Sequence, residues 1–300
     1  MTNENQSDIG WELYHSYLSV LNEGSLSGAA RAMGIAQPTV GRHIAALEKA
    51  LGVTLFTRSQ LGLLPTDAAV ALQSFAQAMS TSATALKRAA EGQGSGIKGT
   101  VRITASEVIG VEVLPPILAD LQTTYPDLKL ELVLTNRVQD LLNREADIAV
   151  RMTQPKQEQL IARRVGQVDL GFHAHKAYLQ RRGTPQTLAD LAQHALIGFD
   201  EETPFVRAAR KGFPLWSRAA FTFRTDSDVG QLALIRAGCG IGICQNALAA
   251  RDPQLVHLLP DSLTIGLETW LTMHEDLRNT PRCKLTFDAL LQGLQAYMDE

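Results

Sequence analysis

Cysteine and long apolar runs are both scarce in this chain. The three cysteines, Cys239, Cys244 and Cys283, are too few and too clustered for a disulfide framework, so a reducing compartment is expected. No stretch approaches the ~18 apolar residues of a membrane span. The polar start, residues 1–8, has no basic region followed by an apolar run, so no secretory signal is expected. The sequence therefore predicts a cytoplasmic protein with no membrane partner.

Motifs for catalysis are missing as well. The sequence contains no nucleophile–base motif and no phosphate-binding loop. A metal site built from Cys239 and Cys244 with His257 or His274 lacks ligand spacing. We therefore expect neither an enzyme nor a resident metal or cofactor.

Charge is balanced overall but unevenly placed. The formal net charge of −3, taken alone, argues against a nucleic-acid binder. Between residues 25 and 58, however, the basic side chains are Arg31, Arg42, Lys49 and Arg58, against Glu48 as the single acidic one. Because DNA binding needs only a local positive patch, this segment is compatible with a DNA-binding face.

Glycine is concentrated at one place, which divides the chain. Four glycines fall within residues 91–99, too many for a helix or a packed strand, so a hinge is expected there. The length of 300 residues predicts two or three domains. We expect a helical domain over 1–66, a linker helix over 67–91, the hinge over 92–99 and a second globular part over 100–300.

Before the hinge, apolar residues recur at helical spacing. The pattern predicts a first helix that ends near Gly24 and a second that begins at a Ser27 cap and ends at Gly34. Pro38 suits the first turn of a third helix, where its missing N–H costs nothing. The first part of the chain is therefore predicted to be a bundle of short helices.

A hairpin over residues 55–65 is predicted next, and Thr66 is expected to cap a long helix that runs to about Glu91. Its apolar residues alternate spacings of four and three, which is typical of a seam between paired helices. The alternative is an amphipathic helix packed on its own domain. The seam residues are Leu72, Ala76, Met79, Ala83, Leu86 and Ala90.

After the hinge, strands and helices alternate. The order strand–helix–strand–helix–strand predicts a parallel, doubly wound sheet, and a second set of the same kind follows. Two such lobes form a cleft, and ligands of α/β folds bind at the carboxyl ends of the strands. The expected strands are 101–105, 128–134, 147–151, 196–199, 220–224 and 240–244, and the expected helices are 114–124, 138–144 and 229–237.

Residues 23–44 carry the pattern of a helix-turn-helix. The small side chains of Ala29 and Ala30 let two helices cross closely, and Gly34 permits a tight turn. The helix from Gln37 then presents polar side chains that can reach base edges and phosphates.

This stretch resembles the signature of LysR-type transcription regulators. The shared features are a glycine–serine entry at Gly24, the double alanine at Ala29, the Gln37–Pro38 start of a recognition helix, and a Leu-Phe-Thr-Arg wing strand over 55–58. The resemblance covers nearly the whole chain. In the second part it is carried by 147–151, 162–164, 187–191 and 238–242.

The resemblance implies a mixed fold: an all-α winged helix-turn-helix followed by an α/β sensor of two lobes, like a periplasmic binding protein. It implies a transcription regulator that binds double-stranded DNA at paired half-sites and pairs its linker helices in a homodimer or homotetramer. A small-molecule effector would bind between the lobes, and RNA polymerase would be a further partner.

The candidate DNA-contacting residues are polar or basic side chains of the helix-turn-helix and wing. Arg58 is expected on phosphate, with a surface salt bridge as the alternative, and His43 on a base or phosphate, with simple exposure as the alternative. Two positions depart from the family: Ala36 replaces a capping serine and Gly41 another serine. The wing tip, 60–64, also lacks the usual basic residues. The candidates are Ser27, Arg31, Gln37, Pro38, Thr39, Arg42, His43 and Arg58.

The candidate effector-binding residues follow strands or open a helix near the expected cleft. Ser106 and Thr135 match family positions that often touch effector, and Arg151 would bind a carboxylate or pair with Asp147. For each candidate the alternative is ordinary loop or cap chemistry. The candidates are Ser106, Thr135, Asn136, Arg151, Phe205, Asp226 and Ser227.

Two further functions are weighed. A solute-binding protein that uses its N-terminal helices only to oligomerise would share the two lobes, but the helix-turn-helix argues against it. A redox switch at Cys239 and Cys244 is disfavoured, because these thiols sit in an apolar segment without a nearby cation to lower their pKa.

Overall fold

The computed structural model describes residues 9–59, 62–91, 97–136, 145–155, 159–202, 207, 216–263 and 265–299 of the chain. It divides into two compact units, Met1–Lys87 and Arg88–Glu300, called here the N-terminal and C-terminal units. None of the helices in these ranges combines the length and hydropathy needed to cross a bilayer.

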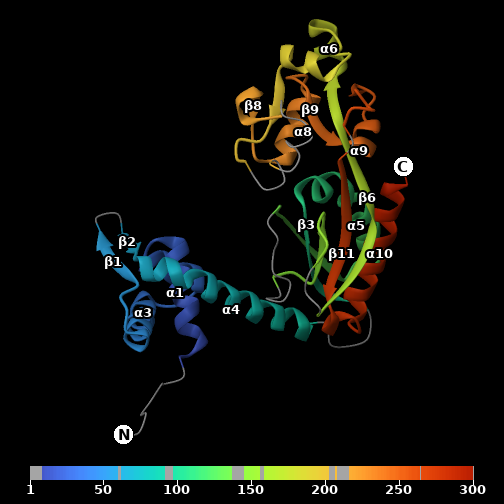
Figure 1. Cartoon of the computed structure of the whole chain (residues 1–300). Helices are drawn as coiled ribbons and strands as arrows, with labels where there is room; N and C mark the ends of the chain where they lie inside the picture. Colours follow the sequence, from blue (N-terminus) through green and yellow to red (C-terminus); the bar gives the residue numbers. More distant parts are fainter. Residues whose placement is uncertain are drawn as a thin grey trace. The chain divides into compact units, whose positions relative to one another are not determined.

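The N-terminal unit contains three short helices, a hairpin and most of a long helix (Figure 1). The apolar faces of the short helices meet in one core, where Tyr17, Ala29, Val40 and Leu47 are at most 1% exposed. This packing confirms the predicted helix-turn-helix. The elements are α1 (Trp11–Glu23), α2 (Leu26–Met33), α3 (Gln37–Leu51), β1 (Phe56–Ser59), β2 (Gly62–Pro65) and α4 (Asp67–Glu91).

Two local features set the ends of α2. The Oγ of Ser25 accepts a hydrogen bond from the backbone N–H of Gly28 at 3.1 Å and so caps the helix. The prediction that Ser27 is the cap is wrong, because Ser27 lies inside α2 with its side chain exposed. Gly34 ends the helix at φ 66°, a left-handed conformation that glycine adopts without steric cost, and allows the tight turn into α3.

A carboxylate on α3 fixes the wing hairpin of β1 and β2. Glu48 Oε1 accepts the backbone N–H of Leu55 at 2.7 Å. On the other strand, the N–H of Leu63 donates to the carbonyl oxygen of Gly24 at 3.0 Å. A Cβ at Gly62 would lie 2.7 Å from that same oxygen, so only glycine lets the wing approach the end of α1 this closely.

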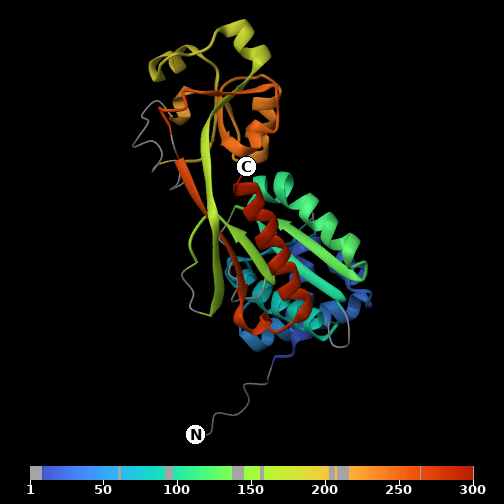
Figure 2. The ribbon, with the colours of Figure 1, turned by 90° about the vertical axis from the view of Figure 1, so that its right-hand side faces the viewer.

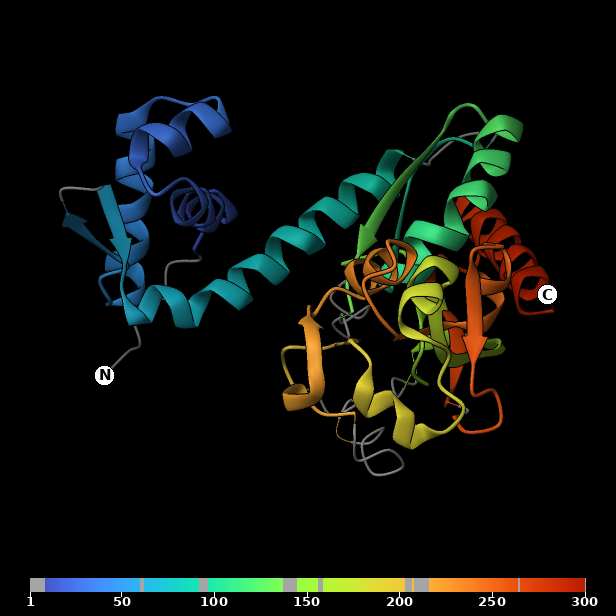
Figure 3. The same ribbon diagram turned by 90° about the horizontal axis from the view of Figure 1, so that it is seen from above.

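Helix α4 is continuous over 25 residues (Figure 3). Thr66 caps its start, as predicted, by accepting a backbone hydrogen bond at 3.2 Å. Only part of the predicted seam is available to pair with a second helix. Ala76 is 3% exposed within the core of the N-terminal unit, whereas Met79 is 40% and Leu86 72% exposed. Phe75, which the prediction left out, is 70% exposed. The α4 apolar face is therefore Phe75, Met79 and Leu86, without Ala76.

One seven-stranded sheet runs through the C-terminal unit. Strand β3 (Gly99–Ala105) lies between β4 (Leu128–Leu134) and β5 (Ile148–Arg151) and is parallel to both. This confirms the three parallel strands predicted for the beginning of this unit. Strand β11 (Ile265–His274) runs antiparallel to β5 and to the 16-residue β6 (Leu160–His175). The sheet is therefore mixed, and the prediction of a wholly parallel sheet is wrong.

The long strands β6 and β11 connect two lobes (Figure 2). Lobe I holds β3 to β5, η1 (Ile109–Val113), α5 (Leu114–Thr124) and α10 (Pro281–Met298), which packs along β6 and β11. Lobe II holds the elements between these strands. They are α6 (Lys176–Arg182), η3 (Leu188–Gln193), β7 (Leu196–Gly198), η4 (Arg218–Ala220), β8 (Phe221–Arg224), α8 (Asp228–Arg236), β9 (Gly242–Gln245), α9 (Asn246–Ala250) and β10 (Leu255–Leu258); η5 (Glu275–Leu277) follows β11.

The second predicted set of strands is present in lobe II but is divided between two sheets. Strands β7 and β8 form a parallel pair of their own, whereas β9 and β10 extend the large sheet by pairing antiparallel with β6. The predicted helix over 138–144 lies outside the described residues. The two-lobed α/β architecture is confirmed.

The last turn of α4 belongs to the C-terminal unit and is held there by buried charges. Arg88 Nε lies 3.2 Å from Asp147 Oδ2, and Arg282 Nη2 donates to the carbonyl oxygen of Arg88 at 2.7 Å. Asp147 Oδ2 also accepts the N–H of Arg102 at 2.8 Å. Arg88, Asp147 and Arg282, here the linker anchor, are 5%, 7% and 4% exposed.

Candidate nucleic-acid interface and ligand cavity

The side of α3 opposite the core forms a polar surface together with α2 and the wing. Because Val40, Ile44 and Leu47 are buried against the core, the opposite side of α3 faces solvent. Arg42 Nη2 donates to Thr39 Oγ1 at 3.3 Å on this exposed side. Of the candidate residues, Ser27, Arg31, Gln37, Pro38, Arg42 and Arg58 are exposed, and Thr39 and His43 are partly buried.

His43 has a partner within the protein. Its Nδ1 lies 2.7 Å from the Oγ of Ser16, a fully buried residue of α1. The contact ties α3 to α1 and fixes the orientation of the imidazole. One nitrogen of His43 is therefore engaged in holding the recognition helix in place.

The start of α3 is uncapped by any side chain. Ala36 occupies the cap position in extended conformation, with φ −70° and ψ 138°, and forms no side-chain hydrogen bond. The wing also presents apolar surface, since Leu64, the cross-strand neighbour of Thr57, is 49% exposed. Residues 60 and 61 of the wing tip lie outside the described residues.

A cavity of about 640 Å³ lies between the two lobes of the C-terminal unit. Trp216 and Phe199 of lobe II and Ile265 and Leu267 of β11 give it apolar walls. Polar groups enter from the ends of β3, β4 and β5 and from the start of α8. An apolar cavity with a few convergent polar groups is typical of a small-molecule site.

Ser106 and Arg151 supply hydrogen-bond donors from lobe I. The Oγ of Ser106 is buried, lines the cavity and has no hydrogen-bond partner in the described structure. Arg151 donates to Thr104 Oγ1 at 2.7 Å and to the carbonyl oxygen of Val150 at 2.9 Å, and not to Asp147, which Arg88 binds. Burial lowers the pKa of Arg151 to about 10. A guanidinium is thus held partly desolvated, with neutral partners, at the cavity wall.

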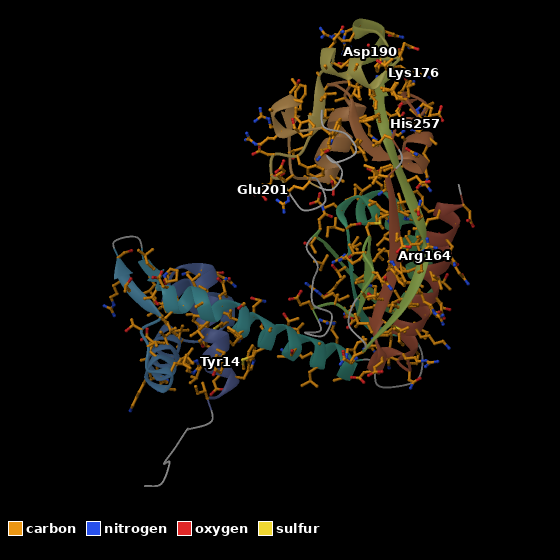
Figure 4. All side chains as sticks on the ribbon, in the orientation of Figure 1. Tyr14, Arg164, Lys176, Asp190, Glu201 and His257 are labelled. Atoms are coloured by element: carbon orange, nitrogen blue, oxygen red, sulfur yellow. The ribbon has the colours of Figure 1, made fainter. Side chains whose placement is uncertain are left out.

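Acidic groups enter the cavity from lobe II. Asp228, in the first turn of α8, accepts a hydrogen bond from Asn136 Nδ2 at 2.8 Å. Burial and the negative charge of Glu107 raise the pKa of Asp228 to about 6. Asp226 Oδ1 accepts the backbone N–H groups of Asp200 and Glu201 at 3.0 and 2.8 Å. Glu201, at the cavity edge, is labelled in Figure 4.

Polar bonds across the cavity edge hold α8 against lobe I. Glu112 in η1 forms a two-pronged ion pair with Arg236, at 2.7 and 2.9 Å. This pair raises the pKa of Arg236, chiefly through the hydrogen bond to Glu112. Ser227 Oγ donates to Glu107 at 2.8 Å. Together with the Asn136–Asp228 bond, these contacts fix the two lobes around the cavity.

The predicted effector residues divide into three groups. Ser106, Asn136, Arg151 and Asp226 line the cavity. Thr135 precedes the lining residue Asn136 but does not itself line the cavity. Ser227 instead caps α8 by accepting a hydrogen bond from the N–H of Gly230. Phe205 lies outside the described residues. The prediction missed Glu201, Trp216, Asp228 and Gln231; Asp228 directly follows the predicted cap Ser227 and could have been found there.

Two family models match the chain. Residues 11–70 match the bacterial regulatory helix-turn-helix protein of the lysR family, and residues 94–295 match the LysR substrate binding domain. The chain belongs to the LysR family of bacterial transcription regulators.

Individual relatives of this LysR-type regulator are also transcription regulators. A probable HTH-type transcriptional regulator, LtrA of Klebsiella pneumoniae, is 26% identical over 93% of both chains. An HTH-type transcriptional regulator of Xanthomonas campestris is 28% identical over 60% of this chain and 53% of its own length. The solved structure of CrgA, a LysR-type transcriptional regulator from Neisseria meningitidis, is 25% identical to this chain with a TM-score of 0.59. The match covers 94% of this chain and 98% of CrgA.

The family fixes the general activity. The protein is a DNA-binding transcription regulator with an effector-binding domain, and it is not an enzyme, because the family and the named relatives are transcription regulators. The solute-binding alternative is therefore excluded.

The three cysteines of the LysR-type regulator are free thiols. Burial raises the pKa of Cys244, which lines the cavity, and of Cys283 to about 12. A thiol in that state is a poor nucleophile, which for Cys244 supports the expectation that it is not part of a redox switch. No group of three metal-binding side chains occurs in the described ranges.

Proposed function

We propose that the cavity binds the effector of this regulator and that Ser106 and Arg151 hold an anionic group of that effector. The observation that carries the proposal is a pair of donors without an acidic partner at the ends of β3 and β5. Ser106 has a buried hydroxyl without a partner, and Arg151 has neutral partners only. A carboxylate would accept from both and would neutralise the guanidinium in a partly desolvated site.

The test is a thermal-shift screen of the full chain against carboxylic acids and their neutral amides. A bound acid at 100 times its Kd should stabilise the wild type by about 2.7 kcal/mol. Arg151→Gln should weaken that binding at least tenfold, and Ser106→Ala less. Arg163→Gln, which removes the same charge from an exposed position on β6, is the control. Equal binding of acids and amides, or an unchanged Kd in Arg151→Gln, would contradict the proposal.

We also propose that α2, α3 and the wing contact double-stranded DNA through the eight candidate residues named above. The exposed basic side chains Arg31, Arg42 and Arg58 support this assignment. The regulator would act in the cytoplasm, where its promoter lies, with RNA polymerase as a further partner. Residues 1–66 would bind DNA, 67–91 would pair chains, 92–99 would serve as a hinge, and 100–300 would bind effector.

We infer that two chains pair through the α4 apolar face in a homodimer or a tetramer built from it. Phe75 and Leu86 are 70% and 72% exposed, and pairing would remove them from water at about 25 cal/mol per Å². Phe75→Glu with Leu86→Glu should therefore favour monomers in size-exclusion chromatography with light scattering. Gln73→Glu with Gln77→Glu adds the same charge at exposed polar positions and should leave the mass unchanged. A wild-type mass in the first variant would place the dimer interface elsewhere.

A further inference from the structure

The cavity wall carries several carboxylates, which a purely anionic ligand would not bind. Glu201, Asp226 and Asp228 line it from lobe II, and Arg151 is the single basic residue on its described wall. Glu107 lies just outside and acts on Asp228 through its charge. The cavity as a whole is therefore negative, although one of its ends is built for an anion.

Three of these carboxylates have neutral partners. Asp228 accepts from Asn136, Asp226 from two backbone N–H groups, and Glu107 from Ser227. Within the described ranges, no lysine, arginine or histidine forms an ion pair with any of them. The nearby cations are engaged elsewhere. Arg218 and Arg224 face Asp200, and Arg236 binds Glu112.

Such an arrangement is unfavourable in the absence of a ligand. A partly buried carboxylate beside a second one loses hydration and is repelled, which is why the pKa of Asp228 rises to about 6. Either a proton or a cation relieves this repulsion. At neutral pH the proton is largely absent, so a positively charged ligand group placed beside Asp228 would gain most from the site.

We propose that the effector is zwitterionic: a protonated amine binds Asp228 and Asp226 on lobe II, while its carboxylate binds Ser106 and Arg151 on lobe I. The proposal rests on the proposed effector function of the cavity. The body of the ligand lies against Trp216 and Phe199, whose aromatic faces also favour a nearby ammonium. One molecule thus contacts both lobes through opposite charges.

The test compares matched sets of probes on the full chain by isothermal titration calorimetry at pH 7.5. Each set holds an amino acid, the acid without its amine, and the amine without its carboxylate. Phenylalanine, 3-phenylpropanoate and 2-phenylethylamine form one set, and leucine, 4-methylpentanoate and 3-methylbutylamine form another. A further series of ω-amino acids, each with the acid that lacks its amine, increases the distance between the ammonium and the carboxylate. We expect amino acids of at least one spacing to bind at least tenfold more tightly than either partner compound.

The variant Asp228→Asn keeps the shape and the acceptor for Asn136 but removes the charge. It should abolish the tenfold preference for the amine and leave the affinity for the plain acids within about twofold. Asp288→Asn, the same change at an exposed position of α10, should keep the preference.

The outcomes separate the two proposals. If plain acids bind wild type as tightly as amino acids do, and Arg151→Gln weakens both, the zwitterion is excluded and the effector cavity stands. If amines bind irrespective of Asp228, the assigned acidic end is wrong. If none of the probes binds at 10 mM, or binding ignores both Arg151 and Asp228, both proposals fail.

Discussion

The C-terminal unit holds one cluster of buried charges, in the linker anchor, and one cluster of half-buried to exposed charges, around the cavity, and only the first is matched by opposite charge. In the linker anchor, Arg88 and Asp147 face each other at 3.2 Å, and Arg282 donates to backbone carbonyls. Around the cavity, the half-buried Asp228 and the exposed Asp226 accept hydrogen bonds from amide groups, and the half-buried Arg151 donates to a hydroxyl and a carbonyl. The two clusters lie at opposite ends of the same short strand, because β5 begins after Asp147 and ends at Arg151.

The difference separates structural from ligand-binding charges. In a buried ion pair, each charge is neutralised by the other, so no ligand is required. Removing one member leaves the other buried without a partner, which is strongly destabilising. Half-buried charges that the fold leaves without opposite charges, such as Asp228 and Arg151, are unfavourable until a proton or a ligand neutralises them. We therefore expect loss of charge to weaken the protein at the anchor and to strengthen it at the cavity.

The largest effect is expected at the anchor. Asp147→Ala should lower the free energy of unfolding of the C-terminal unit by about 3 to 5 kcal/mol, because it removes the carboxylate bound to Arg88 and the acceptor for the N–H of Arg102. Urea denaturation measures this. The control, Glu131→Ala, breaks the exposed pair with Arg102 and should cost less than about 1 kcal/mol. Equal losses in the two variants would refute the contrast.

The cavity should respond in the opposite direction. The pKa of Asp228 is raised in the folded state to about 6, so its protonated form stabilises the fold, and this stability is lost as pH rises from about 4 through 6. Asp228→Asn should therefore be more stable than wild type at pH 7.5, by about 2 to 3 kcal/mol at most, and equal to it near pH 4. Denaturation at both pH values checks this, and a variant less stable at pH 7.5 would show that the carboxylate is satisfied.

Exposed charges of the N-terminal unit form a third case. Arg42→Ala should leave the unfolding free energy within about 0.5 kcal/mol of wild type, because the side chain faces solvent. Affinity for a specific operator should fall by about 1 to 3 kcal/mol if Arg42 reads a base edge, with less effect on unrelated DNA. Fluorescence anisotropy at several salt concentrations distinguishes this from a phosphate contact, which would weaken all sequences alike. Unchanged affinity for both DNAs would remove Arg42 from the interface.

The smallest effect concerns a backbone group rather than a charge. Ala36→Ser places an acceptor at the bare start of α3 and should stabilise the N-terminal unit by about 1 kcal/mol or less. Gly41→Ala is the companion test of the same helix, and an added Cβ there meets Leu26 at an unstrained 3.7 Å. A lower melting temperature in Ala36→Ser would show that water or another group already satisfies these N–H groups.

The sequence was sufficient wherever the determinants are local. The turn at Gly34, the start of α3 at Pro38 and the cap at Thr66 depend on neighbouring residues, and the structure has all three. Ser25 and Ser27 are both plausible caps, and only the geometry of α2 chooses between them.

What the sequence did not reveal depends on distant contacts. Ala76 and Phe75 both fit an apolar repeat, but packing against the rest of the N-terminal unit buries one and exposes the other. The pairing of β6 with β11 joins residues about a hundred positions apart, so alternation along the chain could not show it. Asp228 became a site residue only because the fold brings Asn136 and Glu107 to it.

The linker anchor also determines at which residue a C-terminal fragment for ligand screening has to begin. A fragment that starts at Ile97, after the glycine-rich sequence, would lose Arg88 and leave Asp147 in the interior without its guanidinium. We expect such a fragment to express poorly, whereas one that starts near Ala83 would keep Arg88 and the helical turn before it. Cleavage by a protease should accordingly yield a stable product only when the cut falls on the N-terminal side of Arg88.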